Sequence, residues 1–423
     1  MRYIAILSLL LLTFTSTSFA ATAPKPHVNH EPVYTPDPKP DADEPPSLAY
    51  LRWMRLARIN QAILPELSTG RYHYGAFINF DITPKTMQKT MPGEEEDYFV
   101  LSSAGVDLAA DLSRWWHGQI SVAYYESNKG QGDALYNRGL QLDDAYILLA
   151  DFNEYPWFLQ LGRLYLPFGY YDRYAVTPTL VQLLGETRVA AVQMGFMHWN
   201  GWSASVYFSQ GVVTHTMMKI QGDINTGAML DYQWLCGPWD VQVGAQYMDN
   251  MLHTNAFAQG GWYESNHVLP GVYNVYSNHV PGLAAQGHIG YGGFLVFADY
   301  ITALRTAHNL VHHYGSLEPE PSDPTYHAKP QAWDVGARYD FTLWDVDFSL
   351  DGSYQRSYDA AGLVVFNAKP YHPFPKIRYI IGLNIRIIDE AYIRIQWGHN
   401  VLYHLGDCGR QGDNATIRFA ARI

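Results

Sequence analysis

The chain is poor in cysteine and has no long apolar run beyond its first residues. Only Cys236 and Cys408 stand among its 423 residues, too few for the disulfide framework of a small secreted scaffold. After residue 20 no stretch approaches the ~20 apolar residues that a membrane-spanning helix needs. The sequence therefore argues against a disulfide-rich domain and against a bundle of transmembrane helices.

Basic charge and catalytic motifs are also scarce. The 28 Lys and Arg are outnumbered by 40 Asp and Glu, a net charge of −12, which disfavours nucleic acid as a partner because nucleic-acid-binding surfaces are basic. We find no G-x-S-x-G, H-E-x-x-H, C-x-x-C or phosphate-binding loop. The chain is therefore expected not to be an enzyme and to need no cofactor. A hydrolase whose Ser-His pair forms across strands stays open as an alternative.

Aromatic residues, by contrast, are abundant. They make up 15% of the chain, with 32 Tyr and 12 Trp. Hydrophobic residues reach 48%, yet the mean hydropathy is −0.18, so apolar side chains are dispersed. Amphipathic rings in such numbers suit the two interfaces of a membrane.

The first 66 residues divide into three predicted segments. Arg2, the apolar run from Ile4 to Leu12 and the small residues before Ala20 predict a signal peptide over residues 1–20. Residues 21–46 are rich in proline and predict an extended linker. Residues 47–66 predict a short amphipathic basic helix, which either lies on the surface or gates or docks from the periplasmic side.

From residue 71 to residue 423 the hydrophobic period is two, which predicts an all-β barrel domain. The runs are each ~10 residues long, enough to cross a bilayer when tilted. They predict sixteen strands, near residues 71–83, 98–112, 115–127, 140–151, 156–166, 189–199, 202–210, 224–235, 239–248, 283–291, 293–302, 331–342, 345–355, 376–387, 390–400 and 414–423.

The connections alternate between short and long. The short ones include "NG", "CGPW" and "TLWD", and the long ones include residues 167–188, 249–282, 303–330 and 356–375. This pattern is typical of a closed antiparallel transmembrane barrel in the bacterial outer membrane, with tight periplasmic turns, long external loops and both termini periplasmic. A secreted β-sandwich or propeller is the alternative.

Tryptophans flank the short turns. Asn200-Gly201 supplies the positive φ angles of a tight hairpin, and its neighbours Trp199 and Trp202 are expected in an aromatic girdle at the periplasmic rim. The same interpretation applies to Trp115, Trp116, Trp157, Trp234, Trp239 and Trp344.

Charged residues share the polar faces of several strands. A charge on the lipid face costs ~2–4 kcal/mol near the midplane, so these residues are expected in the lumen. They either line a water-filled channel with a basic stripe or pair with one another and stabilise the wall. The lumen candidates are Arg378, Arg386, Arg394, Arg418, Arg422, Asp107, Asp111, Asp340, Asp347 and Asp351.

The third external loop, residues 166–188, mixes aromatic and charged residues. Folded into the lumen, it would form a constriction that selects solutes by charge and size; otherwise it is an ordinary surface loop. Its candidate residues are Tyr170, Tyr171, Asp172, Arg173, Tyr174, Glu186 and Arg188.

Histidines gather in the predicted external loops. In "HNLVHH", His308 and His312 would lie on one face of a helix and, with His313, are weak candidates for a metal site. Solvated loop histidines are the simpler interpretation, so no metal is predicted.

Two stretches carry a family resemblance. "DDAYILLADFNEYPWFLQLGRLYLPFG" at residues 143–169 and "TPTLVQLLGETRVAAVQMGF" at 177–196 resemble the LbtU-type siderophore porin family. The resemblance implies an outer-membrane barrel of about sixteen strands, implicated in uptake of the ferric siderophore legiobactin and its relatives. It carries over no catalytic or ligand residue.

We therefore expect a porin whose lumen is narrowed by its third loop and which takes up ferric siderophore independently of TonB. Residues 21–70 are too short for the plug domain of an energy-coupled receptor. A general or anion-preferring nutrient porin and an adhesin or structural barrel are the alternatives. The expected partners are outer-membrane lipids, a ferric siderophore or other small solute, the barrel-assembly machinery and further copies of the chain.

Overall fold

The structure, a computed structural model, describes part of the chain. The predicted signal peptide, linker and basic helix lie outside the described residues, so those three assignments stay predictions. The described residues are 67–69, 72–83, 98–125, 139–152, 154–169, 175–198, 200–210, 224–254, 273–276, 278–312, 325–360, 365–366, 369–370, 374–388, 390–403 and 411–422.

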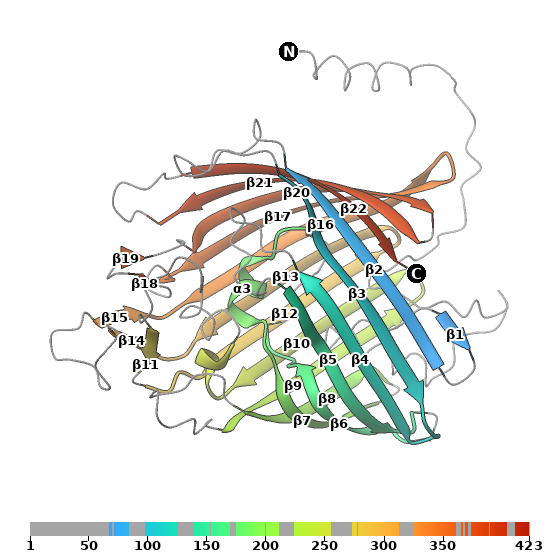
Figure 1. The fold of residues 1–423 in the computed structure, drawn as a ribbon, viewed down its shortest axis with the longest axis horizontal. Coiled ribbons are helices and arrows are strands. Elements are labelled where there is room, and N and C mark those ends of the chain that lie inside the picture. The colour runs from blue at the N-terminus through green and yellow to red at the C-terminus, as the bar shows by residue number, and fades with distance from the viewer. Residues whose placement is uncertain are drawn as a thin grey trace, which may run out of the picture.

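Sixteen antiparallel strands close into a barrel, as the period-two pattern predicts (Figure 1). Each strand pairs with its neighbour in the chain, and β22 returns to pair with β2, with Asp81 opposite Arg418. The strands are β2 (Tyr72–Thr83), β3 (Tyr98–Asp111), β4 (Trp116–Tyr125), β5 (Gly139–Ala150), β6 (Trp157–Tyr165), β7 (Arg188–Met197), β8 (Trp202–Gln210), β9 (Ile224–Cys236), β10 (Trp239–Met248), β12 (Gly282–Tyr291), β13 (Phe294–Ala303), β16 (Gln331–Leu343), β17 (Val346–Tyr358), β20 (Pro375–Ile388), β21 (Ala391–Leu402) and β22 (Gln411–Arg422).

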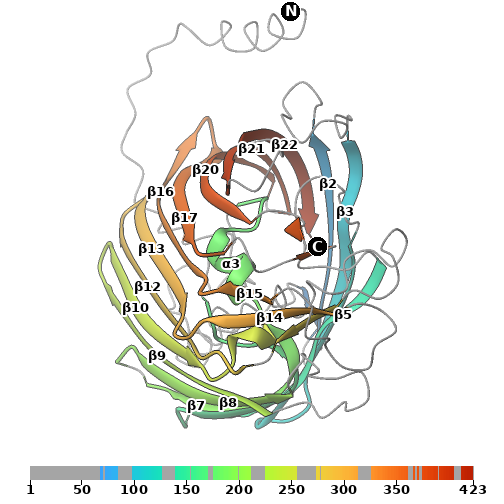
Figure 2. The ribbon, with the colours of Figure 1, turned by 90° about the vertical axis from the view of Figure 1, so that its left-hand side faces the viewer.

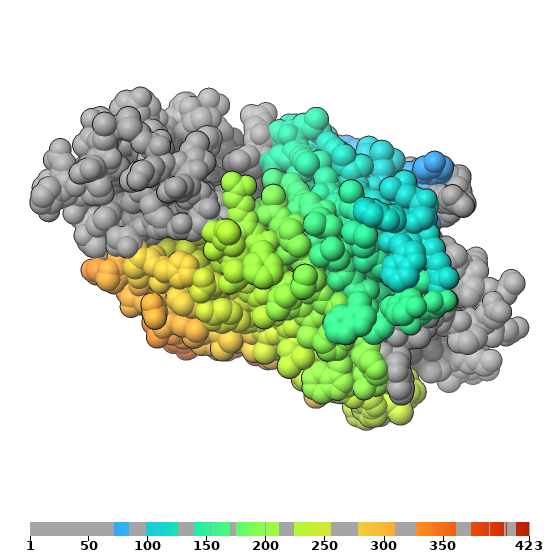
Figure 3. Space-filling view, turned by 90° about the horizontal axis from the view of Figure 1, so that it is seen from below, coloured from blue at the N-terminus to red at the C-terminus, as the bar shows by residue number. Residues whose placement is uncertain are grey.

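The two faces of each strand differ because successive side chains point to opposite sides of a sheet. On β8, Val206 and Phe208 are exposed on the outer wall, whereas Ser203 and Ser205 are buried inside. Figure 3 shows part of this outer wall as a continuous surface built by the successive strands. The exterior is therefore apolar and the interior largely polar, the reverse of a soluble barrel.

The short turns lie at one end of the barrel. At one of them Gly201 has φ 97° but Asn200 does not have the positive φ expected for it, so this turn is not of type I′. The amide of His198 donates to the carbonyl of Trp202 at 2.7 Å. At another, Trp344 and Asp345 both have positive φ, the geometry of a type I′ turn. Trp199 lies outside the described residues. The tryptophans exposed near this end are Trp115, Trp116, Trp157, Trp202, Trp234, Trp239 and Trp344.

The opposite end carries small elements that the sequence pattern does not reveal (Figure 1). The strands β11 (Tyr273–Tyr276), β14 (Ala307–His312) and β15 (Thr325–Ala328) form one sheet, and β18 (Val365–Phe366) pairs with β19 (Lys369–Pro370). A short 3-10 helix, η2, spans Met251–His253. At the short-turn end, β1 (Leu67–Thr69) pairs with the start of β2.

The helix on which the weak metal candidates depended is absent from the described part of this end. His308 and His312 lie on strand β14, so they do not have the spacing of a helical metal site. The pairing of β14 with β11 and β15 explains the difference, since the segment completes its backbone hydrogen bonds with neighbouring strands. Among the described helices, none has the length and apolarity to span a membrane.

Candidate functional site in the barrel lumen

The connection between β6 and β7, residues 166–187, is called loop 3 below. Its described residues lie inside the barrel, where helix α3 (Leu180–Gly185) packs against β13, β16 and β17 (Figure 2). Thr179 caps the helix, because its hydroxyl accepts a hydrogen bond from the amide of Gln182 at 3.1 Å. Most of α3 is buried, so the helix forms part of the packed interior.

Glutamines on the wall hold the backbone of loop 3. Gln246 of β10 accepts from the amide of Gly169 at 2.7 Å. Gln396 of β21 accepts from the amide of Val176 at 2.6 Å and donates to the hydroxyl of Thr177 at 2.7 Å. Gln355 of β17 accepts from the amide of Leu180 at 3.0 Å.

An arginine adds one more contact between loop 3 and the wall. The Arg378 guanidinium of β20 donates to the carbonyl of Pro178, and its Nε donates to Asn400 at 2.7 Å. The loop therefore begins and ends on β6 and β7, and its hydrogen bonds reach β10, β17, β20 and β21.

Two glycines meet where loop 3 leaves and rejoins the wall. Gly169 has φ 70°, and a side-chain carbon at Gly169 or Gly185 would come within 2.8 Å of the other residue's Cα. Ile301 of β13 packs against the same point. Gly169 ends the "GRLYLPFG" segment and Gly185 begins "GETR", so the two motif segments come together in space.

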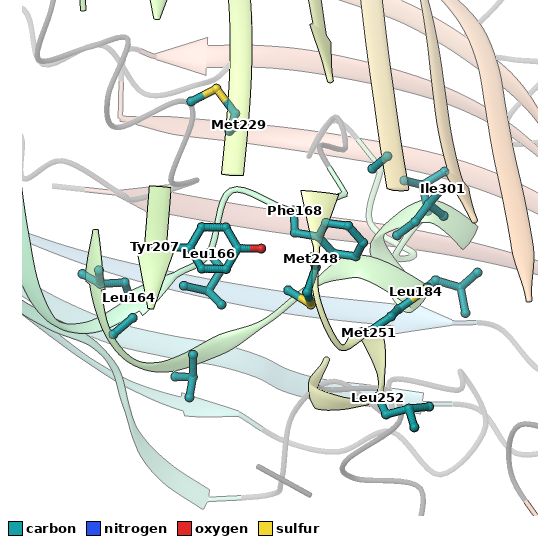
Figure 4. Packing of buried hydrophobic residues seen from close by; sticks show 14 of the residues in the cluster. Leu164, Leu166, Phe168, Leu184, Tyr207, Met229, Met248, Met251, Leu252 and Ile301 are labelled. Atoms are coloured by element: carbon teal, nitrogen blue, oxygen red, sulfur yellow. The ribbon is translucent and has the colours of Figure 1, made fainter. Parts of the chain in front are cut away.

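An apolar cluster packs beneath loop 3. Phe168 and Leu184 of the loop lie with Ile301 of β13, and Tyr207, Met248 and neighbouring residues extend the cluster across β8 to β10 (Figure 4). These side chains are almost fully buried, so this side of the lumen is filled by protein. The cluster also includes Leu164, Leu166, Leu180, Val181, Met229, Met251 and Leu252.

The loop 3 residues predicted from sequence have different outcomes. Tyr170, Tyr171, Asp172, Arg173 and Tyr174 lie outside the described residues. Glu186 and Arg188 are buried at the end of the loop, and Arg188 forms an ion pair with Asp143 of β5.

Tyrosines complete the surroundings of Arg188. Its guanidinium lies 5.4 Å from the ring centre of Tyr165 and 5.9 Å from that of Tyr125, and both hydroxyls donate to Asp143. Glu186 lies 3.9 Å from the Arg188 Nε. Asp143, Tyr125 and Tyr165 surround Arg188 but were not among the site residues predicted from sequence.

Most of the predicted lumen charges stand in ion pairs. Arg394 donates to both oxygens of Asp351 at 2.8 Å, and Arg418 makes two 2.7 Å hydrogen bonds to Asp81. The other pairs are Arg422 with Asp107 at 3.3 Å, Arg338 with Asp340 at 2.7 Å and Arg386 with Asp347 at 3.9 Å, and Asp111 contacts His117 at 2.6 Å and His73 at 3.2 Å. The geometry therefore favours charges that pair along the wall over an unbalanced basic stripe.

The pairs differ in exposure. The side chain of Arg394 is 5% exposed and that of its partner Asp351 is fully buried. On the neighbouring strand β22, Arg418 lies directly opposite Arg394 in register; its side chain is 22% exposed and that of Arg422 17%. Asp111 reaches 33%, and Arg386 of β20 and Asp347 of β17 reach 45% and 41%. Partly exposed charges therefore lie on β3 and β22 and also on β17 and β20.

No group of three or more His, Cys, Asp or Glu residues within the described ranges has the arrangement of a metal site. His308 faces His327 of β15 with 4.6 Å between ring centres, and His313 lies outside the described residues. Gln246, Gln355 and Gln396 were not predicted as functional residues. In the sequence each is only a glutamine on the inner face of a strand. Many other lumen positions carry polar residues in the same way, so the pattern does not single these three out.

The chain has distant relatives and structural neighbours. No family model matches it. A UPF0422 protein of Coxiella burnetii is 21% identical over 317 residues, 74% of this chain and 61% of the relative. A UPF0422 protein of Legionella pneumophila strain Philadelphia 1 is 21% identical over 316 residues, 72% of this chain and 54% of the relative. The chain therefore matches little more than half the length of these relatives.

Among solved structures, Salmonella typhi OmpF in complex with daunomycin superimposes with a TM-score of 0.52 at 11% identity. The match covers 83% of this chain and 97% of OmpF. At this identity the likeness shows the fold alone, that of a porin-like barrel. It agrees with the sixteen-strand architecture and says nothing of the solute.

Proposed function

We propose that the protein is an outer-membrane channel through which small hydrophilic solutes diffuse past loop 3. The observation that carries this proposal is the set of hydrogen bonds from the backbone of loop 3 to Gln246, Gln355 and Gln396. A loop folded inward and fixed at several points narrows a lumen without needing to move. The apolar exterior and closed sheet support placement in a bilayer.

The passage lies between loop 3 and the wall formed by β22, β2 and β3. The contacts of loop 3 given above are on β10, β13, β16, β17, β20 and β21, and the partly exposed Arg418 and Arg422 lie on the remaining wall. Charges of both signs are paired on this wall and largely cancel at a distance, so the passage suits polar solutes without a strong preference for one sign of charge.

The proposed orientation follows from the connections. The long ones face the outside and the short turns face the periplasm, so both chain ends are periplasmic. The exposed tryptophans at the short-turn end then lie at the inner interface of the membrane. Delivery of the barrel to the membrane would involve the assembly machinery.

Ferric siderophore is the proposed solute, and it rests on the resemblance of residues 143–169 and 177–196 to the LbtU-type family. A general nutrient porin is the second candidate, favoured by the balance of paired charges in the lumen, which gives no strong preference for anions.

Single-channel conductance in a planar bilayer tests the proposal. Stable conductance that ferric siderophore blocks in a saturable manner supports both the pore and the solute. Conductance that is indifferent to ferric siderophore, and to the iron-free siderophore as the matched control, leaves a general porin. The full barrel giving no conductance in any salt would overturn the channel and favour a structural or adhesive barrel.

A further inference from the structure

Two histidines share one carboxylate near the short-turn end of the barrel. Asp111 is the last residue of β3, His117 is the second residue of β4 and His73 is the second residue of β2, and the three strands lie side by side (Figure 1). Nδ1 of His117 lies 2.6 Å from Oδ1 of Asp111, and Nε2 of His73 lies 3.2 Å from Oδ2. Each carboxylate oxygen therefore faces one imidazole ring. These three residues are called the histidine cluster below.

The histidine cluster faces the lumen. On β3, Asp107 is buried inside and Leu108 is exposed on the outer wall. Because side chains alternate along a strand, Asp111 shares the inner face with Asp107. The side chains of Asp111, His73 and His117 are all partly exposed. The cluster is therefore open to whatever passes through this end of the lumen.

Both ring nitrogens of His117 face oxygen atoms. Nδ1 faces the Asp111 carboxylate, and Nε2 lies 3.2 Å from the carbonyl oxygen of Ala150, the last residue of β5. An ionised carboxylate and a carbonyl only accept hydrogen bonds, and a neutral imidazole has a single N–H. The two hydrogen bonds can therefore form together only when the ring carries both protons. The geometry suits the imidazolium form of His117, whose charge Asp111 balances.

The charge of the cluster follows the pH. Histidine is the side chain whose charge normally changes between pH 5 and pH 8. Because Asp111 contributes one negative charge, the cluster changes from about +1 with both rings protonated to about −1 with both rings neutral.

Other charged groups surround the cluster and stand in ion pairs of their own. They are Arg422 of β22 with Asp107, and Arg114 on the turn before β4 with Asp151 and Glu154 on the turn after β5. Arg71 precedes His73 by two positions and lies outside the described residues. A comparison of variants that differ only in the two histidines leaves all these groups unchanged, so it isolates the contribution of the cluster.

We propose that the histidine cluster makes the ion selectivity of the passage depend on pH. The cluster lies on β2, β3 and β4, at the short-turn end of the wall along which the passage runs, so a permeating ion must pass it. Below about pH 6 its positive charge favours anionic solutes, and above about pH 8 its negative charge favours cationic ones. This inference rests on the proposed function, because only an open lumen brings ions to the cluster.

Reversal potentials in a potassium chloride gradient at low ionic strength, measured at pH 5 and pH 9, test the inference. In the wild type the ratio of chloride to potassium permeability should fall about threefold between the two pH values. His73→Gln with His117→Gln should remove most of this fall, because glutamine keeps a polar side chain and takes up no proton. His198→Gln is the matched control. His198 lies on the turn between β7 and β8 at the same end and contacts Asn200 rather than a carboxylate, so the variant should keep the wild-type fall.

Nuclear magnetic resonance of the barrel labelled with 15N-histidine, in detergent, gives a second readout that needs no current. The signals that disappear in His117→Gln identify His117, and they should change from two protonated nitrogens to one as the pH rises from 5 to 9. Heat-modifiable migration on gels confirms that each variant is folded.

The possible failures can be told apart. An equal fall in permeability ratio for the wild type and the double histidine variant would overturn the role of the cluster and leave the channel standing. A His117 ring with one proton at both pH values would also overturn it. Absence of conductance at both pH values would overturn the proposed channel and this inference together, and it differs from the first result because no reversal potential could be measured.

Discussion

The side-chain oxygen of Gln355 accepts a hydrogen bond from the backbone amide of Leu180 at 3.0 Å, although 175 residues separate the two in the chain. Leu180 begins helix α3, whose first amides have no partner within the helix. Gln355 of the wall therefore accepts a hydrogen bond from an amide at the start of α3 that has no partner within the helix. The position of loop 3 thus depends on strands far from it in sequence.

Removing the glutamines that hold loop 3 should loosen it. Gln355→Ala with Gln396→Ala leaves the amides of Leu180 and Val176 unpaired, at a cost of about 1–3 kcal/mol for each buried group. We expect single-channel conductance to rise and to become noisier, because the loop samples positions away from the wall.

Gln193→Ala is the control for this experiment. Gln193 is a buried lumen glutamine on β7 that donates to Ser205 at 3.1 Å. Its loss should leave conductance close to that of the wild type. Identical conductance of the double variant and the wild type would show that loop 3 does not limit the passage.

Gly185→Ala should destabilise the barrel. The added methyl group would lie 2.8 Å from the Cα of Gly169 and 3.0 Å from Ile301, and overpacking of this kind costs about 1–3 kcal/mol. Urea unfolding in detergent measures the change. Gly287→Ala is the matched control, because its nearest neighbour would be 3.4 Å away, and its midpoint should stay near that of the wild type.

Charge reversal on the wall of the proposed passage should change ion selectivity. Arg422→Glu places a carboxylate beside Asp107 and makes this side of the lumen more negative. We expect the reversal potential in a salt gradient to shift toward cation preference, more strongly at low salt, where screening is weak. Arg114→Glu, on the turn before β4, should shift it less. A larger shift for Arg114→Glu would argue against the proposed passage.

The ion pair between Arg418 and Asp81 should stabilise barrel closure. Asp81 is 2% exposed, so Arg418→Gln leaves a buried carboxylate without its cation, which costs about 3–5 kcal/mol. The double variant Arg418→Gln with Asp81→Asn should recover part of that loss. Unfolding midpoints of the two single variants and the double variant give the coupling free energy, and purely additive effects would contradict a direct interaction.

The sixteen strands could be predicted from sequence because their pattern is local. On β8, alternation of serine with valine and phenylalanine reports which side chains face lipid, and no distant residue is needed to read it. The charged residues Arg394 and Arg418 could be assigned to the lumen for the same reason. Their partners could not, because pairing depends on register between strands.

The interior arrangement of loop 3 depends on contacts that leave little local signal. Gln396 looks like any other polar lumen residue, yet it holds Val176, 220 positions earlier. The histidine pair in "HNLVHH" is a case where local spacing and tertiary structure differ. Its spacing fits a helix, but β11 and β15 provide partners that make the segment a strand.

The pairing of β2 with β22 has a consequence for folding kinetics. Asp81 and Arg418 are 337 residues apart, so the last hydrogen-bonded seam requires nearly the whole chain and carries a large loop-closure cost. Successive hairpins can form as the chain becomes available, whereas this seam can form only after β22 has been synthesised. A chain truncated before β22 would keep two open sheet edges in the bilayer, where unpaired backbone groups are costly.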